Sequence, residues 1–189
     1  REAAPAPAAE SPRGQPAHEA RERAADWFAQ LAADWAAAAA AGFVPMVAGD
    51  LNARTGAAPD WQPGDGDSQA RCSADNTVCP RGKLLLQFCG DVGARIANGR
   101  VPGDRHGART STGVSRGGTA VVDYFILPTT WLPQVRALRV SADPVVADHC
   151  SLVLTLAADS VPAAPAAAAG SPVDPCAARF PSRPPHGDR

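Results

Sequence analysis

The sequence has no apolar run long enough to cross a membrane. A transmembrane helix needs about 20 consecutive apolar residues, whereas the Ala-rich run at residues 35–48 is shorter and is interrupted by Gly42 and Pro45. A positively charged start followed by an apolar stretch, which a secretory signal requires, is also missing. We therefore expect an intracellular protein without a membrane partner. The chain begins with Arg1 rather than Met, which suggests a fragment or a processed piece.

The sequence also lacks a strong excess of charge of either sign. Its 18 basic and 19 acidic residues give a net charge of −1, which does not by itself indicate a nucleic-acid partner. Residues 71–139, however, hold ten basic and four acidic side chains, an excess of six positive charges. The ten are Arg71, Arg81, Lys83, Arg95, Arg100, Arg105, Arg109, Arg116, Arg136 and Arg139. The arginine guanidinium suits phosphate oxygens, although GC-rich coding would produce the same bias.

The cysteine count is odd, which does not favour a framework of disulfide bonds. The five are Cys72, Cys79, Cys89, Cys150 and Cys176. Without a secretory signal they are expected to be reduced thiols. Cys89 lies in an apolar helical pattern and Cys150 opens an apolar strand, so both are predicted to be core residues. A zinc site at Cys72 and Cys79 would need two more ligands at close spacing, and none is evident.

Composition divides the chain into a central domain, residues 17–158, and two flanking segments. Residues 1–16 are mostly Ala, Pro and Gly, and residues 159–189 are rich in Ala and Pro. Both segments are expected to be disordered, because such compositions bury too little apolar surface to fold. The 189 residues are enough for one domain with a core of useful size.

Helical periodicity marks two segments of the central domain. The first is expected to begin near His18 and to stop at Gly42. Its apolar stripe, which is predicted to be core, consists of Trp27, Phe28, Leu31 and Trp35. The second helix is predicted at residues 81–92. Between them, residues 54–80 form a polar stretch that is long for a loop; it is either a substrate-facing excursion or partly disordered.

A short apolar run, residues 43–48, ends abruptly on Gly49, Asp50 and Asn52. Runs of this length bounded by turn residues are typical of buried strands. Ligands bind at the carboxyl ends of strands in open α/β sheets, and on extended backbone Asp50 and Asn52 would share a face. The simpler alternative is a turn that only closes the strand.

A carboxylate lies inside a second apolar segment, residues 120–127. The segment is apolar on both faces, which predicts a buried strand. Asp123 inside such a strand is costly unless it is paired or hydrogen-bonded. His149, just before an alternating apolar strand at residues 151–156, is the expected partner; a backbone group or an arginine is the alternative. Further strands are expected at residues 94–97 and 135–140.

The chain resembles the endonuclease/exonuclease/phosphatase superfamily in three motifs and their order. These are GDLNA at 49–53, VDYFIL at 122–127 and DHC at 148–150. RGKLL and IANGR, which begin at Arg81 and Ile96, are similar more particularly to the endonuclease domain of non-LTR retrotransposons. The resemblance covers residues 25–158 and corresponds to the C-terminal half of the family's domain. It implies an α/β fold, as a partial two-sheet α/β sandwich of the DNase I-like type.

The resemblance also implies roles for individual residues in Mg²⁺- or Mn²⁺-dependent phosphodiester hydrolysis. Asp50 would orient or deprotonate the attacking water, and Asn52 would hold the phosphate. His149 would contact the phosphate. Asp148 would orient the His149 imidazole or, together with Asp50, bind the metal. Asp123 has no single implied role and is expected to support the site from within the sheet. An Asp–His pair also makes physical sense, because a carboxylate fixes the imidazole tautomer and favours the imidazolium.

The chain departs from the family pattern in ways that bear on function. The family begins with a half-domain that carries an Asn and a metal-binding Glu, and nothing before Asp50 matches them. Ala147 and Ala120 stand where a serine and a small hydroxyl residue are usual. We therefore expect a truncated DNA endonuclease module of retrotransposon origin, nuclear if that origin holds, with little activity alone. The alternatives are an inositol-phosphate or lipid-headgroup phosphatase and an inactive, non-enzymatic remnant.

Overall fold

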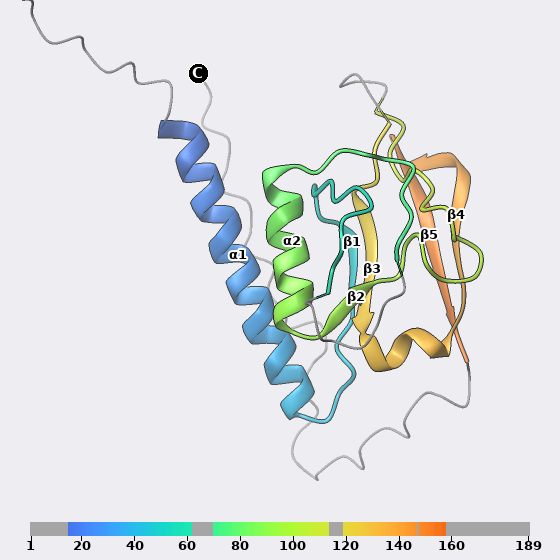
Figure 1. Cartoon of the computed structure of the whole chain (residues 1–189), viewed down its shortest axis with the longest axis horizontal. Coiled ribbons are helices and arrows are strands. Elements are labelled where there is room, and N and C mark those ends of the chain that lie inside the picture. Colours follow the sequence, from blue (N-terminus) through green and yellow to red (C-terminus); the bar gives the residue numbers. More distant parts are fainter. Residues whose placement is uncertain (1–14, 62–69, 114–118, 147, 158–189) are drawn as a thin grey trace, which may run out of the picture.

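The computed structural model describes residues 15–61, 70–113, 119–146 and 148–157 (Figure 1). Two helices, α1 (Gln15–Ala40) and α2 (Pro80–Asp91), lie on one side of a three-stranded antiparallel sheet of order β1-β3-β2. Its strands are β1 (Val47–Asp50), β2 (Ala94–Ile96) and β3 (Asp123–Pro128). A 3-10 helix, η2 (Thr129–Gln134), leads into a second antiparallel sheet of β4 (Val135–Val146) and β5 (His149–Leu156). The predicted α/β class with two sheets is confirmed.

Helix α1 packs its apolar stripe against α2. Phe28 and Trp35 are buried and Leu31 is partly buried, as the helical spacing predicted. Trp27 differs: it is 41% exposed, and the guanidinium of Arg81 lies 5.2 Å from the centre of its ring. Adjacent residues of a helix do not face the same neighbour. Burial of Phe28 therefore turns Trp27 toward the edge of the helix interface.

Helix α2 begins one residue earlier than predicted. Pro80 occupies its first turn, where no backbone N–H is needed, and the sulfur of Cys79 caps it by accepting a backbone hydrogen bond at 3.3 Å. Cys89 is fully buried, as expected of a core residue. The ring of Phe88 meets Trp35 edge-on, with ring centres 5.8 Å apart. This aromatic contact joins the two helices.

Strand β3 is buried on both faces because it lies between two hydrophobic clusters. Tyr124 and Ile126 belong to the cluster beneath the helices, which also holds Phe28 and Trp35. Leu127, with the partly buried Phe125 beside it, belongs to the cluster between β3 and the second sheet. The strand begins at residue 123, three residues later than predicted. Asp123 is therefore the N-terminal residue of a buried strand.

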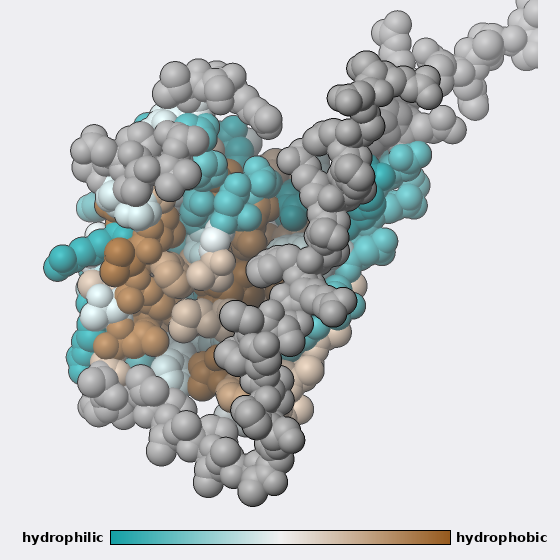
Figure 2. All heavy atoms as spheres, turned by 180° about the vertical axis from the view of Figure 1, so that it is seen from behind, coloured by the Kyte–Doolittle hydropathy of each residue, from teal (hydrophilic) through white to brown (hydrophobic). Residues whose placement is uncertain are grey.

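Strand β1 differs from the prediction in position and in burial. It spans Val47–Asp50 rather than residues 43–48, and only its first residue is partly buried. It is an edge strand that pairs with β3, and no described residue pairs with its other edge. Phe43 and Met46 are 60% and 39% exposed, and hydrophobic residues also gather on the surface in Figure 2. The predicted buried strand is therefore wrong.

The remaining strands follow the predicted pattern with different lengths. In β5, Leu152, Leu154 and Leu156 pack on the second cluster while Val153 is 56% exposed, which confirms the alternation. Strand β4 continues to residue 146, beyond the predicted 135–140, and pairs with β5 through several register shifts. Strand β2 ends at residue 96, one residue earlier than predicted.

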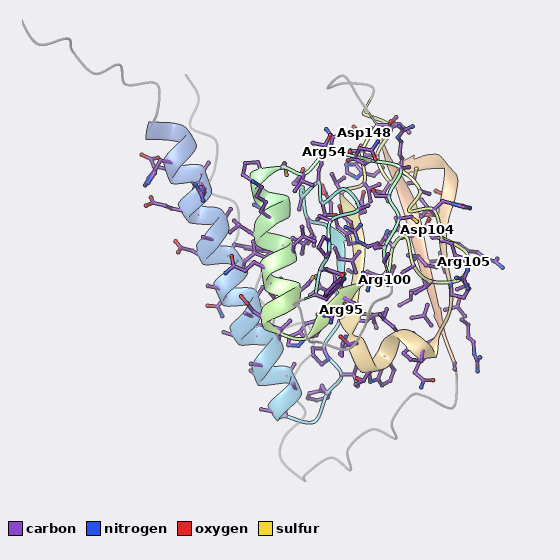
Figure 3. All side chains as sticks on the ribbon, viewed as in Figure 1. Arg54, Arg95, Arg100, Asp104, Arg105 and Asp148 are labelled. Atoms are coloured by element: carbon purple, nitrogen blue, oxygen red, sulfur yellow. The ribbon has the colours of Figure 1, made fainter. Side chains whose placement is uncertain are left out.

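Three arginines of the basic segment belong to the core rather than to a phosphate-binding surface. Arg71, Arg95 and Arg100 are at most 7% exposed; Figure 3 labels the last two. Arg100 donates to the buried carboxylate of Asp60 at 2.5 Å, and Arg95 donates to the Asp60 carbonyl at 3.3 Å. Burial lowers the pKa of Arg71, and the charge of Asp60 opposes that shift. Residues 54–61 and 70–80 thus include core residues, which corrects the expectation of a substrate-facing excursion. Residues 62–69 lie outside the described residues, so partial disorder of this stretch stays a prediction.

The remaining predictions concern membrane-spanning helices, the cysteine thiols and the two ends of the chain. In the described part of the chain, no helix is long and apolar enough to cross a membrane. Cys72, Cys79, Cys89 and Cys150 are free thiols, as expected. The predicted disordered arm and tail fall largely on residues 1–14 and 158–189, outside the described residues. Residues 15–16 belong to α1 instead of the arm.

Candidate active site

The first residues of β3 and β5 form a carboxylate–imidazole pair. His149 Nδ1 lies 3.1 and 3.0 Å from the two carboxylate oxygens of Asp123. The Asp123 side chain is 12% exposed, whereas the His149 side chain is 33% exposed. The carboxylate is thus fixed within the protein while the imidazole reaches the surface. His149, which the sequence predicted as the partner of Asp123, is its partner in the structure.

Two further carboxylates lie near the other imidazole nitrogen. His149 Nε2 is 3.6 Å from Asp148 Oδ1 and 4.0 Å from Asp50 Oδ2. The hydrogen bond with Asp123 raises the pKa of His149 above its usual value, against the lowering effect of burial, and the surrounding negative charges add to the rise. Donation from Nδ1 to Asp123 fixes the imidazole tautomer, and the raised pKa extends the imidazolium form to higher pH than in a free histidine.

Asp50 and Asn52 form a closed turn rather than a shared strand face. The two oxygens of Asp50 accept hydrogen bonds from the Asn52 backbone N–H at 2.8 Å and from its Nδ2 at 3.1 Å. Asn52 has a φ of 49°, in the left-handed region that Asn adopts more readily than most residues. The prediction of extended backbone is therefore wrong here, although the two side chains do lie together.

Two hydrogen bonds hold this turn in place. The N–H of Leu51 donates to the carbonyl of Val122 at 2.9 Å, and Arg81 Nε donates to the carbonyl of Leu51 at 2.7 Å. The Arg81 guanidinium also lies 5.2 and 5.6 Å from the ring centres of Trp27 and Phe28. Arg81 therefore links both helices to the turn. In the sequence, Arg81 is one charge of the basic segment and the first residue of the RGKLL motif, and neither feature indicates this anchoring role.

Tyr124 joins the backbones that carry the two motifs. Its hydroxyl lies 2.7 Å from the carbonyl oxygens of both Ala53 and Val121 and 3.1 Å from Thr55 Oγ1. One carbonyl follows the Asp50 turn and the other precedes β3. Burial raises the pKa of Tyr124 to about 12. The hydroxyl therefore stays protonated at neutral pH and remains a donor.

Asp75 supports the same backbone and was not identified from the sequence. Arg54 donates to both of its carboxylate oxygens at 2.7 Å, and the N–H groups of Thr77 and Val121 donate at 2.9 and 3.3 Å. Burial acts to raise the pKa of Asp75, but these donors outweigh it and hold the pKa below its usual value. Since Arg54 and Val121 flank the two motifs, this buried carboxylate ties them together.

Asp50 and Asp148 are the predicted metal ligands, and both lie beside His149 Nε2. Their side chains are 34% and 32% exposed. Mg²⁺ is usually held by one or two carboxylates together with waters and substrate phosphate, so this pair suits a partly hydrated ion. Among the described residues, no group of three or more His, Cys, Asp or Glu could hold a metal.

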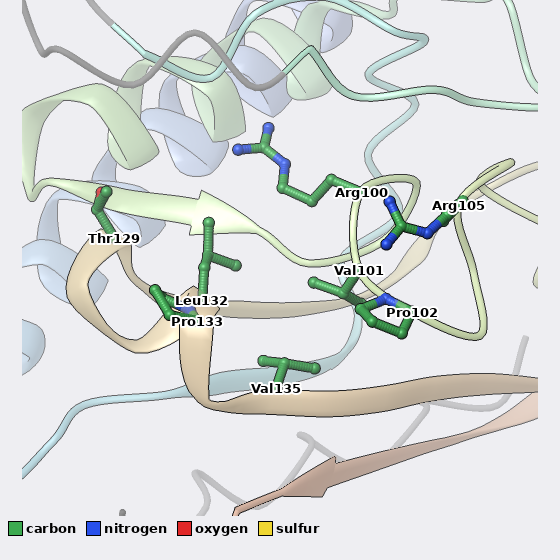
Figure 4. A pocket seen from close by; sticks show the side chains of 8 residues that line it. All are labelled: Arg100, Val101, Pro102, Arg105, Thr129, Leu132, Pro133 and Val135. Atoms are coloured by element: carbon green, nitrogen blue, oxygen red, sulfur yellow. The ribbon is translucent and has the colours of Figure 1, made fainter.

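Two hollows of the surface can be placed relative to this site. One of about 260 Å³ adjoins the candidate site and is lined by Ala48, Gly49, Asp123, Tyr124, Phe125, Cys150 and Leu152. Another, of about 430 Å³, is lined by Arg100, Val101, Pro102, Arg105, Thr129, Leu132, Pro133 and Val135 (Figure 4). None of the predicted site residues lines the latter. The smaller hollow is thus the one associated with the Asp–His pair.

Comparison with solved structures adds a similarity to a nuclease. No protein-family profile matches the sequence, and no curated protein matches it. The structure is similar to that of a 3'-5' exonuclease (NExo) from Neisseria meningitidis, with a TM-score of 0.48 and 18% sequence identity. The matched region covers 78% of this chain and 56% of that one. The chain therefore spans little more than half the length of that exonuclease.

Proposed function

We propose that this site hydrolyses phosphodiester bonds in DNA with the help of a divalent metal ion, as in the endonuclease/exonuclease/phosphatase superfamily. The supporting observation is the imidazole of His149, bonded to Asp123 and flanked by the part-exposed carboxylates of Asp50 and Asp148. Phosphodiester hydrolysis requires an activated water and stabilisation of the phosphoryl charge. These side chains supply a base, a cation and metal-binding oxygens in one place.

Each residue has a role that its contacts permit. Asp50 orients or deprotonates the water, and the imidazolium of His149 donates to a phosphate oxygen. Asn52 Nδ2 has two hydrogens and uses one on Asp50, so the other is available for the phosphate. Asp123 keeps His149 protonated and oriented. A Mg²⁺ or Mn²⁺ ion held by Asp50 and Asp148 would neutralise phosphate charge.

The choice of DNA as the substrate is supported by the exposed part of the basic segment. Arg71, Arg95 and Arg100 do not contribute, because they are buried. Within the described part of the segment, the exposed basic residues are Lys83, Arg105, Arg109, Arg136 and Arg139. Such side chains bind phosphates without regard to base sequence. The proposed origin as a retrotransposon endonuclease is supported by the RGKLL and IANGR motifs of the sequence.

The proposal is tested by conversion of supercoiled plasmid to open circle. Protein is used in excess over plasmid, so that one slow round of nicking is detected even where turnover is weak. We expect nicking that requires Mg²⁺ or Mn²⁺, is stopped by EDTA, and is lost in His149→Ala and Asp50→Ala. His106→Ala is the matched control, because His106 is exposed.

The outcomes distinguish the three functions considered for this chain. Nicking that survives both His149→Ala and Asp50→Ala would come from a contaminant and would contradict the proposal. Release of phosphate from an inositol phosphate, without nicking of plasmid, would identify a phosphatase. Failure with both substrates, even with protein in excess, would contradict the proposal for this chain.

A further inference from the structure

Strand β3 runs past the end of its neighbour β2. The ladder between them ends where Ile96 faces Ile126, yet β3 continues back to Asp123. The N–H of Ala97 still donates to the carbonyl of Phe125 at 2.8 Å. Beyond that bond, no strand among the described residues continues this edge. The backbone groups of Asp123 and its neighbours meet side chains instead.

Asn98 and Thr110 occupy the place of the missing strand. Asn98 Oδ1 accepts from the N–H of Phe125 at 3.1 Å, and its Nδ2 donates to the carbonyl of Asp123 at 3.2 Å. Thr110 Oγ1 accepts from the N–H groups of Val122 and Asp123, both at 3.0 Å. Asn98 is 1% exposed and Thr110 is fully buried. Both backbone polar groups of Asp123 are therefore held by buried side chains.

Thr110 also reaches the strand that carries the histidine. Its carbonyl accepts from the N–H of Cys150, the residue after His149, at 2.8 Å. The next residue, Ser111, forms an isolated β-bridge with His149 itself. One short segment thus holds the backbone on both sides of the contact between Asp123 and His149.

The turn at Gly99 directs Asn98 toward β3. Gly99 has a φ of 80°, and a Cβ at this position would lie 1.8 Å from the carbonyl oxygen of Cys72. The same Cys72 donates its N–H to the Gly99 carbonyl at 2.9 Å. A side chain at position 99 would therefore separate these two segments and move Asn98. This gives the Asn-Gly pair of the IANGR motif a structural purpose.

We propose that Asn98 and Thr110 are positioning residues that set the contact between Asp123 and His149. They act through hydrogen bonds to backbone groups, whereas the substrate would meet Asp50, Asn52 and His149. Their effect on catalysis rests on the proposed function, but their effect on the Asp–His contact does not. A buried donor or acceptor that loses its partner is unfavourable, so the backbone at Asp123 shifts when either side chain is removed.

The test is a spectroscopic one on the full 189-residue chain, without DNA and in EDTA. The readout is the Nδ1 proton resonance of His149, assigned by its absence in His149→Gln. A proton held between imidazole and carboxylate gives a downfield signal that exchanges slowly with water. Thr110→Val removes the acceptor and keeps the side-chain shape, while Thr110→Ser keeps the acceptor. Thr155→Val is the matched control, because Thr155 is exposed on β5.

We expect the resonance to be lost in Thr110→Val and retained in Thr110→Ser and Thr155→Val. A folded Thr110→Val protein with the wild-type resonance would overturn the proposal. Should that variant fail to fold, Asn98→Ala is examined by the same readout. In the wild-type protein, hydrogen exchange of the Asn98 side-chain amide provides a further check. Slow exchange is expected, and exchange as fast as that of an exposed Asn would overturn the proposal.

Nicking is measured in parallel so that the two proposals can fail separately. We expect Thr110→Val to reduce nicking about tenfold or more, a typical loss when a residue behind the reacting group is removed. A wild-type chain that nicks no plasmid would contradict the proposed function. The resonance of His149 would still decide whether Asn98 and Thr110 hold the pair together.

Discussion

Asp123 presents both carboxylate oxygens to His149 Nδ1, at 3.1 and 3.0 Å, although the two residues are 26 positions apart in the chain. The contact depends on the tertiary structure, because β3 and β5 belong to different sheets. Anything that separates these sheets by a small distance removes the hydrogen bond. The pair is therefore a sensitive reporter of the folded state, and the first prediction uses it.

Asp123→Asn should destabilise the protein in a pH-dependent manner. The folded-state pKa of His149 is raised, so the pair stabilises the protein fully below the unfolded pKa of about 6.5. This stabilisation is lost as the pH rises through the folded pKa. We expect the difference in free energy of unfolding between wild type and variant to be larger at pH 6 than at pH 9, measured by urea denaturation.

The control for this prediction is Asp91→Asn, because Asp91 is exposed at the end of α2. It should show little difference at either pH. An equal destabilisation by Asp123→Asn at pH 6 and pH 9 would mean that Asp123 acts without involving the charge of His149.

Tyr124→Phe should destabilise the protein by about 1–3 kcal/mol, because it removes the hydroxyl whose single hydrogen is donated to a buried carbonyl group. The hydroxyl lies 2.7 Å from two such carbonyl oxygens. Tyr124 is the only tyrosine of the chain, so an absorbance titration reports on it directly. We expect tyrosinate to appear only near pH 12, in line with the raised pKa. Ionisation near pH 10 in the folded protein would contradict the buried hydroxyl.

Asp75→Ala should cost about 2–3 kcal/mol in free energy of unfolding, since buried backbone donors lose their acceptor. Arg54 is 39% exposed and can be solvated, so its unpaired charge adds little. The folded pKa of Asp75 is lowered. Its stabilisation is therefore present above the unfolded pKa and is lost as the pH falls through the folded pKa.

Urea denaturation from pH 7 to pH 3 measures the loss at Asp75, with Asp26→Ala as the exposed control. The difference between wild type and Asp75→Ala should shrink toward the acid end of this range. A difference that grows on acidification would show that the carboxylate is not stabilised by Arg54.

Arg81→Ala should loosen the turn that carries Asp50 and Asn52. It removes the hydrogen bond to the Leu51 carbonyl and the contacts with two aromatic rings. Together these are worth about 1–3 kcal/mol. Lys83→Ala is the control, because Lys83 is an exposed cation of the same helix. Urea denaturation should separate the two variants, and equal stability would refute the anchoring role of Arg81.

Binding to DNA should weaken steeply as salt increases, because each neutralised phosphate releases counterions. Filter binding at a series of salt concentrations measures the slope. Arg109→Gln should reduce the slope by about one unit if this exposed side chain contacts a phosphate. Binding that is independent of salt, or absent at low salt, would favour a phosphatase or an inactive remnant.

The helices could be predicted because their signal is local. Phe28, Trp35 and Phe88 recur at helical spacing, and the structure buries all three. Strand β3 was predictable for a similar reason, since its apolar side chains lie on both faces. The pairing of Asp123 with His149 followed from the cost of burying a carboxylate without a partner.

The missed features depend on contacts between distant parts of the chain. Asp60 meets Arg100 from 40 positions away, and no local pattern distinguishes that buried arginine from an exposed one. The left-handed conformation of Asn52 could not be predicted because the sequence Gly-Asp-Leu-Asn is compatible with both a strand end and a turn. Strand β1 was expected to be buried because its residues are apolar. The prediction failed because an apolar run does not show which strands lie beside it.

The conformation of Asn52 limits which residues can replace it. A φ of 49° disfavours side chains branched at Cβ, while the bond from Nδ2 to Asp50 requires an amide. Glycine satisfies the first demand and fails the second, and aspartate would bring a second carboxylate against the first. Saturation mutagenesis at this codon should therefore recover only asparagine among fully active clones, so that a single position is fixed by backbone geometry and by chemistry at once.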